Sequence, residues 1–225
     1  MLAFYDNIIL EKVRGNNMEK EKNFLYKICK NIYSPIIKML YRPKVFGAEN
    51  IPKEGRLIIA GNHKNALDPT IVMSNTNRIV HFMAKEELFK GIHGIIFKKI
   101  GLIKIHRKRS NPLAIIQAED ILNKEGTIGI FPEGTRNKTK QELLKFRTGT
   151  VLLAQKTNTK ILPFAIRGDY KIFKNDLEIE FGKPIDVIGK QKEEANEYLR
   201  NEVLKLLEKK VGKNEIYIYN KSHSR

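Results

Sequence analysis

The chain has 225 residues, of which 41% are hydrophobic and 30% charged, values that fit one globular domain and exclude a disordered chain. Its single cysteine, Cys29, excludes a disulfide within the chain and a zinc site built from thiolates. A formal net charge of +17 indicates an anionic partner, with nucleic acid, anionic lipid headgroups and acidic proteins all open. No apolar run reaches the roughly 18 residues of a transmembrane helix, and no signal peptide is predicted.

The beginning of the chain divides into two segments. Residues 1–17 are predicted to be an unstructured extension, and Met18 is a candidate translation start. In residues 20–41 apolar side chains recur every three or four positions among several lysines, which predicts a helical segment that Pro35 should kink or split. Two interpretations stay open: a pair of helices packed on its own domain, or a basic amphipathic element lying in a lipid interface.

From about residue 44, short strands and helices alternate along the chain. Asp68 followed by Pro69 is typical of a helix N-cap with proline at the first helical position. Pro163 interrupts a hydrophobic strand, which is therefore expected to be an edge strand or to carry a bulge. Strands are predicted at 56–60, 79–83, 102–106, 127–131, 160–166 and 177–181, and helices near 68, at 85–99, 112–126, 148–157 and 193–211. The alternation predicts an α/β domain with a mostly parallel, twisted sheet flanked by helices.

The segment NHKNALDP contains the first candidate site residues, His63 and Asp68. A histidine near its ordinary pKa can take a proton from an attacking hydroxyl, and a carboxylate on its other ring nitrogen fixes the tautomer. Five residues of separation do not place two side chains on one helix face. The pair can form if His63 lies in a turn and Asp68 begins the next helix; otherwise Asp68 is only a helix cap.

The segment FPEGTRN contains the second group, Glu133, Gly134, Thr135 and Arg136, directly after a predicted strand. An arginine can hold a phosphate with two parallel hydrogen bonds, a glutamate can accept hydrogen bonds from hydroxyl groups, and a glycine permits close backbone approach. In parallel sheets the ligand crevice lies beyond the carboxyl ends of the strands. If the strands are parallel, this turn and His63 share one rim of the sheet. Otherwise, FPEGTRN is a polar turn with a surface ion pair.

Two further cations follow the same logic. Arg107 ends the segment GLIKIHR just beyond a predicted strand, where it could meet the same phosphate as Arg136. Lys145, in KFRTG, adds a positive charge downstream. For the Arg107 segment the alternative is a solvated basic loop.

Together these segments resemble the glycerolipid acyltransferases, the family that includes 1-acylglycerol-3-phosphate acyltransferase and carries a His-X4-Asp motif. Four blocks, NHKNALD, GLIKIHR, FPEGTRN and ILPFAI, occur in the family's order, and the resemblance covers roughly residues 44–185. The second block departs from the commonest pattern: Lys104 stands where proline is frequent, and His106 where aspartate is frequent.

The resemblance implies roles for these residues. His63 would be the general base and Asp68 its orienting partner. Substrate binding would fall to Arg107, Glu133, Gly134, Thr135, Arg136 and Lys145. The family uses no metal, nucleotide or covalent acyl-enzyme; its acyl donor is acyl-CoA or an acyl–acyl-carrier protein, and its acceptor is a lysophospholipid. The expected reaction acylates the sn-2 hydroxyl of lysophosphatidate to give phosphatidate in phospholipid biosynthesis, with another lysophospholipid or glycerol 3-phosphate as the alternative acceptor.

The resemblance also implies an organisation. Residues 18–43 would be an amphipathic helical segment that docks on an anionic membrane, 44–212 the α/β acyltransferase domain and 213–225 a basic tail. The protein would be peripheral, or monotopic, on the cytoplasmic face of the cell membrane. Two rival interpretations are weaker: a nucleic-acid-binding protein, for which only the charge speaks, and an inactive family member, against which the intact His63–Asp68 pair speaks.

Overall fold

The chain folds around one seven-stranded sheet with the strand order β1-β7-β6-β2-β5-β3-β4. This is a computed structural model, and it describes residues 24–106 and 111–209. Neighbouring strands are parallel except for β6 and β7, which are antiparallel. The strands are β1 Lys44–Phe46, β2 Leu57–Gly61, β3 Val80–Lys85, β4 Ile103–Ile105, β5 Thr127–Ile130, β6 Ile161–Arg167 and β7 Glu178–Phe181. The predicted mostly parallel sheet is confirmed, with β1 as a strand that the sequence did not reveal.

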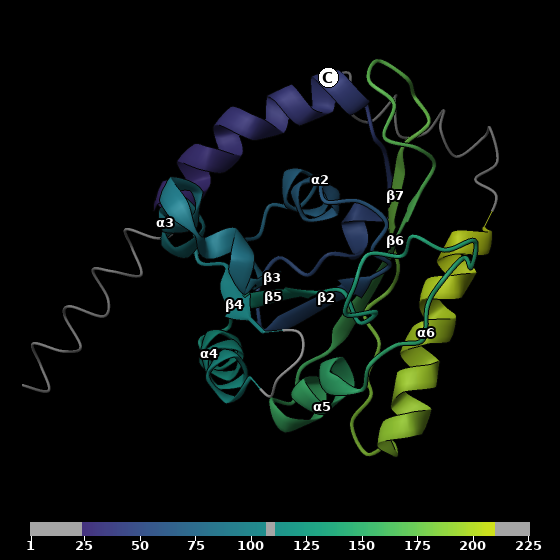
Figure 1. Cartoon of the computed structure of the whole chain (residues 1–225). Coiled ribbons are helices and arrows are strands. Elements are labelled where there is room, and N and C mark those ends of the chain that lie inside the picture. Colours follow the sequence, from purple (N-terminus) through teal and green to yellow (C-terminus); the bar gives the residue numbers. More distant parts are fainter. Residues whose placement is uncertain (1–23, 107–110, 210–225) are drawn as a thin grey trace, which may run out of the picture.

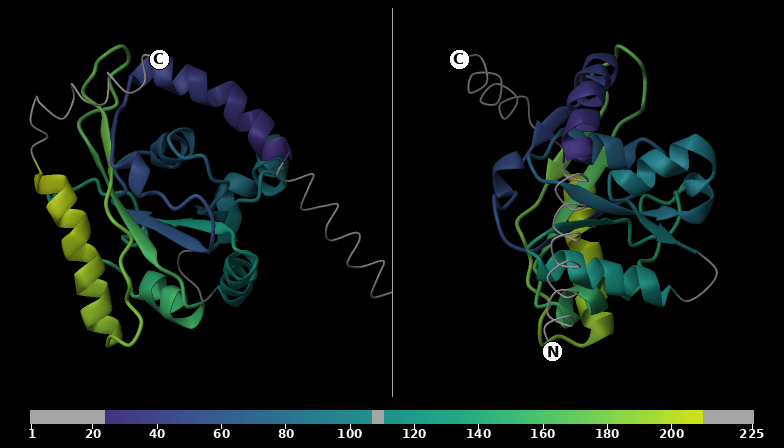
Figure 2. Two further views of the ribbon diagram at one scale, coloured as in Figure 1. Left: turned by 180° about the vertical axis from the view of Figure 1, so that it is seen from behind. Right: turned by 90° about the vertical axis from the view of Figure 1, so that its left-hand side faces the viewer.

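Helices cover both faces of the sheet, as Figures 1 and 2 show. A helix over 24–41, α2 and α3 lie on one side, and α4, α5 and α6 lie on the other. The helical elements are η1 Ala48–Asn50, α2 Asp68–Ser74, η2 Glu86–Phe89, α3 Gly91–Lys99, α4 Pro112–Asn123, α5 Gly149–Lys156 and α6 Lys192–Glu208. The described chain contains no helix whose length and apolar character would suffice to cross a bilayer.

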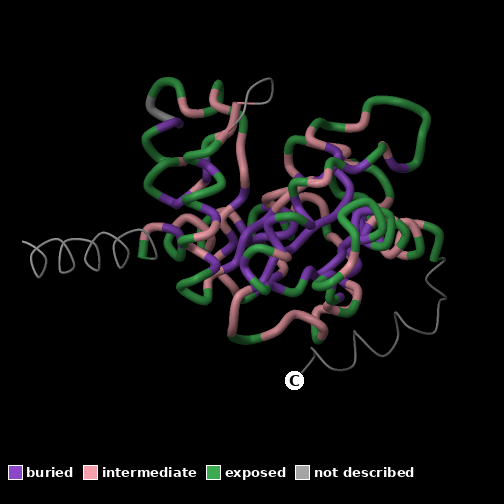
Figure 3. Tube along the Cα trace, turned by 90° about the horizontal axis from the view of Figure 1, so that it is seen from below, coloured by how far each residue is buried: buried purple, intermediate pink, exposed green. Residues whose placement is uncertain are grey.

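Alternation along the central strands builds two hydrophobic cores. In β2, Ile58 and Ala60 face the side of α4, α5 and α6, whereas Leu57 and Ile59 face the opposite side. All four side chains are buried, because a parallel strand covered on both faces has no solvent-facing positions. Figure 3 shows the buried stretches of chain gathered between the two layers of helices.

The N-terminal helix is continuous from residue 24 to 41, so of the two effects expected of Pro35, a kink or a split, the split is wrong. Pro35 has no N–H to donate to the carbonyl of Asn31, one turn earlier in the helix. Both residues are exposed, so water can bind that carbonyl instead. One side of this helix joins the core through Tyr26 and Ile37. The Tyr26 hydroxyl also accepts a hydrogen bond from the backbone N–H of Val80, on β3, at 3.1 Å. The helix is therefore an integral part of the fold.

The strand that contains Pro163 is not an edge strand, because β6 lies between β2 and β7. Its pairing on the β7 side is nevertheless irregular. Ile161 pairs with Ile185 and Phe164 with Phe181, so the neighbouring chain has one more residue than β6 between these two pairs. Proline has no N–H to donate to the neighbouring chain, and the bulge on that side interrupts the regular pairing where this donor is missing.

Candidate functional site

Three loops that leave neighbouring parallel strands meet at one rim of the sheet. β2 lies between β5 and β6 and is parallel to both, so the carboxyl ends of all three strands point the same way. His63 follows β2, Glu133 follows β5, and Arg167 ends β6. The shared rim predicted for His63, Glu133 and Arg136 is therefore confirmed as a matter of topology.

His63 and Asp68 form a hydrogen-bonded pair. The Nδ1 atom of His63 lies 2.8 Å from Oδ2 of Asp68. Asp68 is fully buried, and the His63 side chain retains 11% exposure. The remaining ring nitrogen, Nε2, has no hydrogen-bond partner among residues 24–106 and 111–209. A carboxylate on Nδ1 holds the tautomer whose Nε2 can accept a proton, so the arrangement can serve as a general base.

Asp68 does not cap the helix it begins, contrary to the expectation from the sequence. The N-cap of α2 is Leu67, and no side chain caps this helix. The Asp68 carboxylate turns back instead: its Oδ2 atom accepts the backbone N–H groups of Lys64 at 2.7 Å and Asn65 at 2.8 Å. The carboxylate thereby fixes the turn that follows His63.

The ring of His63 is held from the other side by Phe131, the residue after β5. The two rings are stacked, with centroids 4.0 Å apart and planes 16° apart. Because the ring face lies against Phe131 and Nδ1 is bonded to Asp68, the imidazole has little freedom to rotate. The chain just before His63 is fixed as well, since the Asn62 side chain makes two hydrogen bonds with the backbone of Ile166 on β6.

Glu133 lies beneath the His63 segment. Its Oε1 accepts the N–H of His63 at 2.6 Å, and its Oε2 accepts the N–H of Leu144 at 3.0 Å. Burial raises the pKa of the Glu133 carboxyl, while these two hydrogen bonds act in the opposite direction. Glu133 thereby joins the loop after β2 to the loop after β5. Its direct contact with a substrate hydroxyl stays a prediction.

Gly134 is in the left-handed conformation, with φ of 67°. A Cβ atom at this position would lie 2.6 Å from Nε of Arg147, so both the backbone and the available space favour glycine. The turn is closed by the N–H of Gly134 donating to the carbonyl of Phe131 at 2.9 Å. Asn137 then donates its N–H to the carbonyl of His63 at 2.7 Å, which brings the FPEGTRN turn directly against the His63 segment.

The loop after this turn carries exposed positive charge. Thr135 and Arg136 are exposed, and Lys145 is exposed further along. We define the basic loop as residues 134–147; its five cations are Arg136, Lys138, Lys140, Lys145 and Arg147. Within the described part of the chain, none of the five has an ion-pair partner. Arg107, the other predicted phosphate ligand, lies outside the described residues.

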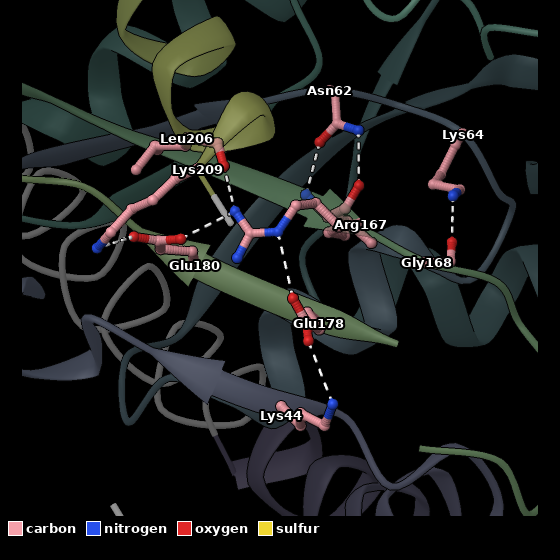
Figure 4. A network of polar contacts seen from close by, with 10 residues as sticks. Lys44, Asn62, Lys64, Arg167, Gly168, Glu178, Glu180, Leu206 and Lys209 are labelled. Atoms are coloured by element: carbon pink, nitrogen blue, oxygen red, sulfur yellow. Dashed lines mark hydrogen bonds and ion pairs between the residues drawn. The ribbon is translucent and has the colours of Figure 1, made fainter. Parts of the chain in front are cut away.

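A cavity of about 430 Å³ opens beside His63. Its lining includes Asn62, His63, Lys64, Glu133, Asn137 and Arg167. Arg167 is paired with Glu180 at 2.9 Å and with Glu178 at 3.3 Å, and Lys64 donates to the carbonyl of Gly168 (Figure 4). These two cations are thus engaged by the protein itself. The basic loop contributes Asn137, Thr139, Gln141 and Glu142 to the lining, whereas Arg136 and Lys145 are not among the lining residues.

The sequence did not point to Tyr170, whose hydroxyl donates to Oδ1 of Asp68. Tyr170 lies 102 positions from Asp68 along the chain, in the loop between β6 and β7, and it belongs to no motif that the sequence displays. Nothing short of the fold itself brings the two residues together.

Comparison with known proteins places this geometry in context. The family model described as "Acyltransferase" matches residues 42–167, which include His63, Asp68, Glu133 and Arg136. The chain is 32% identical over 178 residues to a 1-acyl-sn-glycerol-3-phosphate acyltransferase of Borreliella burgdorferi, covering 73% of this chain and 71% of that protein. It is 29% identical to the Bacillus subtilis protein of the same name, covering 72% and 82% of the two chains.

A solved structure shares the fold. The crystal structure of the 1-acyl-sn-glycerophosphate acyltransferase PlsC from Thermotoga maritima superposes with a TM-score of 0.63 at 21% sequence identity, covering 93% of this chain and 91% of that chain. The family model matches more than half of the chain, and the matched range includes both His63 and Asp68. This chain therefore belongs to the Acyltransferase family.

Proposed function

We propose that this enzyme transfers a fatty acyl group from an acyl thioester to the sn-2 hydroxyl of 1-acylglycerol 3-phosphate, giving phosphatidate. The observation that carries the proposal is the buried Asp68 carboxylate on Nδ1 of His63, a residue that lines a cavity and whose Nε2 has no hydrogen-bond partner in the described chain. The relatives in Borreliella burgdorferi and Bacillus subtilis bear the name of this activity, which supports the choice of acceptor.

The chemistry follows from the pair. Nε2 of His63 takes the proton from the acceptor hydroxyl as its oxygen attacks the thioester carbonyl carbon. The new C–O bond forms, the tetrahedral intermediate collapses, and the C–S bond breaks. The leaving thiolate then takes the proton from the imidazolium of His63, which returns to its neutral state. Asp68 stabilises the imidazolium between the two proton transfers.

The acceptor phosphate is proposed to lie against the basic loop. Arg136 is exposed, carries no ion pair within the described chain, and immediately precedes Asn137, whose N–H binds the carbonyl of His63. A phosphate held there would orient the acceptor relative to His63, a positional contribution to the rate. Arg107 and Lys145 are proposed to assist, while Gly134 and Thr135 would shape the turn around the acceptor.

The acceptor is a lipid, and the outer side of the N-terminal helix is suited to meeting a membrane. We define the apolar stripe as Phe24, Ile28, Ile32, Ile36 and Met39, whose exposed fractions run from 39% to 64%. At 3.6 residues per turn these five positions fall within a sector of about 120°. Lys27 and Lys38 are exposed on the same helix, whereas Lys30 points inward and donates to the carbonyl of Thr76.

The two interpretations of this segment are compatible, because the helix packs on one side and is exposed on the other. Tyr26 and Ile37 secure the inner side in the core, and the apolar stripe faces outward. An apolar stripe beside lysines is typical of a helix that lies in the interface of an anionic membrane. We therefore propose peripheral binding to the cytoplasmic face of the cell membrane, through the outer side of this helix.

A donor-by-acceptor matrix tests the proposed reaction. Purified full-length protein is incubated with acyl-CoA or acyl–acyl-carrier protein, and with lysophosphatidate, other lysophospholipids or glycerol 3-phosphate, in vesicles or detergent. Thiol release and lipid product are both measured. Phosphatidate formed from lysophosphatidate at the highest kcat/KM is the expected result, and a higher kcat/KM with any other acceptor would overturn the acceptor assignment.

A further inference from the structure

The loop between β6 and β7, residues 168–177, reaches from the end of the N-terminal helix to the His63–Asp68 pair. We infer that Tyr170, in this loop, is a positioning residue: its hydroxyl holds Oδ1 of Asp68 so that Oδ2 stays on the His63 imidazole. The inference rests on the proposed role of His63 as the general base, and it concerns a residue that acts through Asp68 without touching the substrate.

The hydrogen bonds of Asp68 divide between its two oxygens. Oδ2 is hydrogen-bonded to Nδ1 of His63 and accepts the backbone N–H groups of Lys64 and Asn65. On Oδ1 the described chain places one donor, the hydroxyl of Tyr170. Because Asp68 is fully buried, bulk water does not reach Oδ1, which without this donor would be an unsatisfied carboxylate oxygen. A carboxylate held at both oxygens cannot rotate about its Cβ–Cγ bond, so Oδ2 remains directed at Nδ1.

The phenol is suited to remain a donor. Burial first, and then the charge of Asp68 and the hydrogen bond to it, raise the pKa of Tyr170 well above its usual range. The hydroxyl therefore keeps its proton throughout the pH range in which such an enzyme works. It can donate to the carboxylate but cannot compete with His63 as a base.

Tyr170 is itself held by the N-terminal helix. Its ring packs edge-on against the ring of Tyr41, with centroids 5.5 Å apart and planes 73° apart. Three residues further on, the backbone N–H of Phe173 donates to the carbonyl of the helix residue Leu40 at 2.6 Å. At the start of the loop, Gly168 accepts a hydrogen bond from the side chain of Lys64 (Figure 4). The helix that carries the apolar stripe is thus connected, through one loop, to the carboxylate that orients His63.

The central test is Tyr170→Phe, which removes one oxygen atom and keeps the ring that packs on Tyr41. We expect kcat to fall about tenfold, with KM for donor and acceptor changed less than twofold, because a charge-assisted hydrogen bond is lost behind the reacting groups. Tyr33→Phe is the matched control: it removes another buried tyrosine hydroxyl on the same side of the sheet, one with no hydrogen-bond partner within the described chain, and kcat should not change.

A double-mutant cycle separates positioning from general stability. In an Asp68→Asn background, adding Tyr170→Phe should change kcat less than twofold, because its effect passes through the carboxylate that is already gone. Thermal unfolding of every variant is recorded, so that a loss of folded protein is not mistaken for a loss of rate. Tyr41→Leu is a second route: it keeps the phenol but removes its support, and kcat should fall about threefold at constant KM.

The failures are distinguishable. If His63→Ala retains the wild-type kcat, the base assignment itself is overturned. If His63→Ala is inactive while Tyr170→Phe is as active as the wild type, only the role of Tyr170 is overturned. A tenfold effect of Tyr170→Phe that persists in the Asp68→Asn background would equally overturn it, because the effect would then not pass through Asp68.

Discussion

The loops that follow β2 and β5 lie side by side but are built in opposite ways. In the turn after β2, His63 and Asp68 are buried or nearly so, and the polar atoms of Asp68 are all engaged by the protein. In the basic loop after β5, five cations are exposed and unpaired within the described chain. The first loop is organised before any substrate arrives, which suits proton transfer. The second leaves its charges to an anionic ligand, which suits binding.

The largest effect should come from the organised loop. His63→Ala removes the proposed base, and loss of general-base assistance typically lowers kcat by ~10²–10⁴-fold. The fold should survive, because within the described chain the polar and ring contacts of the His63 side chain are the Asp68 bond and the Phe131 stack. His81→Gln, which alters an imidazole bonded to the carbonyl of Gly101 away from the site, is the control. Near-normal kcat in folded His63→Ala protein would sink the assignment of His63.

The exposed loop should respond in KM instead of kcat. Arg136→Ala should raise KM for the phosphate-bearing acceptor roughly 10- to 150-fold, the equivalent of the ~1.5–3 kcal/mol of a charge-assisted contact. KM for the acyl donor should change little. Arg107→Ala should act in the same direction, and Lys53→Ala, which removes an exposed cation from the loop before β2, is the charge-matched control. A rise confined to the donor KM would assign these arginines to the thioester's carrier.

Glu133 joins the two loops, so its substitution tests whether they depend on each other. Glu133→Gln keeps the shape but turns one oxygen into an NH₂ group, which must then face the N–H of either His63 or Leu144. Leaving one buried N–H unsatisfied should lower the free energy of unfolding by about 1–3 kcal/mol. Chemical denaturation measures that loss, and kcat should fall with it as His63 loses support. Glu197→Gln, on an exposed residue of α6, should change neither quantity.

The sequence predicted the positions of both loops better than the contacts that connect them to the rest of the fold. The strand ends that carry His63 and Glu133 were predictable because short apolar strands alternate with helices, and the His63–Asp68 pairing because it needs only a turn. The hydrogen bond between Tyr170 and Asp68, 102 residues apart, was not predictable, because it depends on how the β6–β7 loop packs on the N-terminal helix. The expected break at Pro35 failed for a related reason: core packing of Tyr26 and Ile37 holds the helix together on both sides of the proline.

The smallest effect per residue should come from the apolar stripe, where many side chains share the binding energy. Ile32 is 62% exposed, so Ile32→Ser should leave the fold intact and weaken binding to phosphatidylglycerol vesicles about fivefold to tenfold, by the ~1–1.5 kcal/mol expected for an isoleucine partly inserted in lipid. Leu152→Ser is the matched control, because Leu152 is 46% exposed on α5, across the sheet.

High salt screens the lysines but not the apolar area, so it should release the wild type only in part, whereas detergent should release it fully. Deleting the helix would be a poorer test, since Tyr26 and Ile37 belong to the core. If Ile32→Ser floats with vesicles as well as the wild type, and Leu152→Ser does not, the membrane contact lies on the α5 side and the outer side of the N-terminal helix has another purpose.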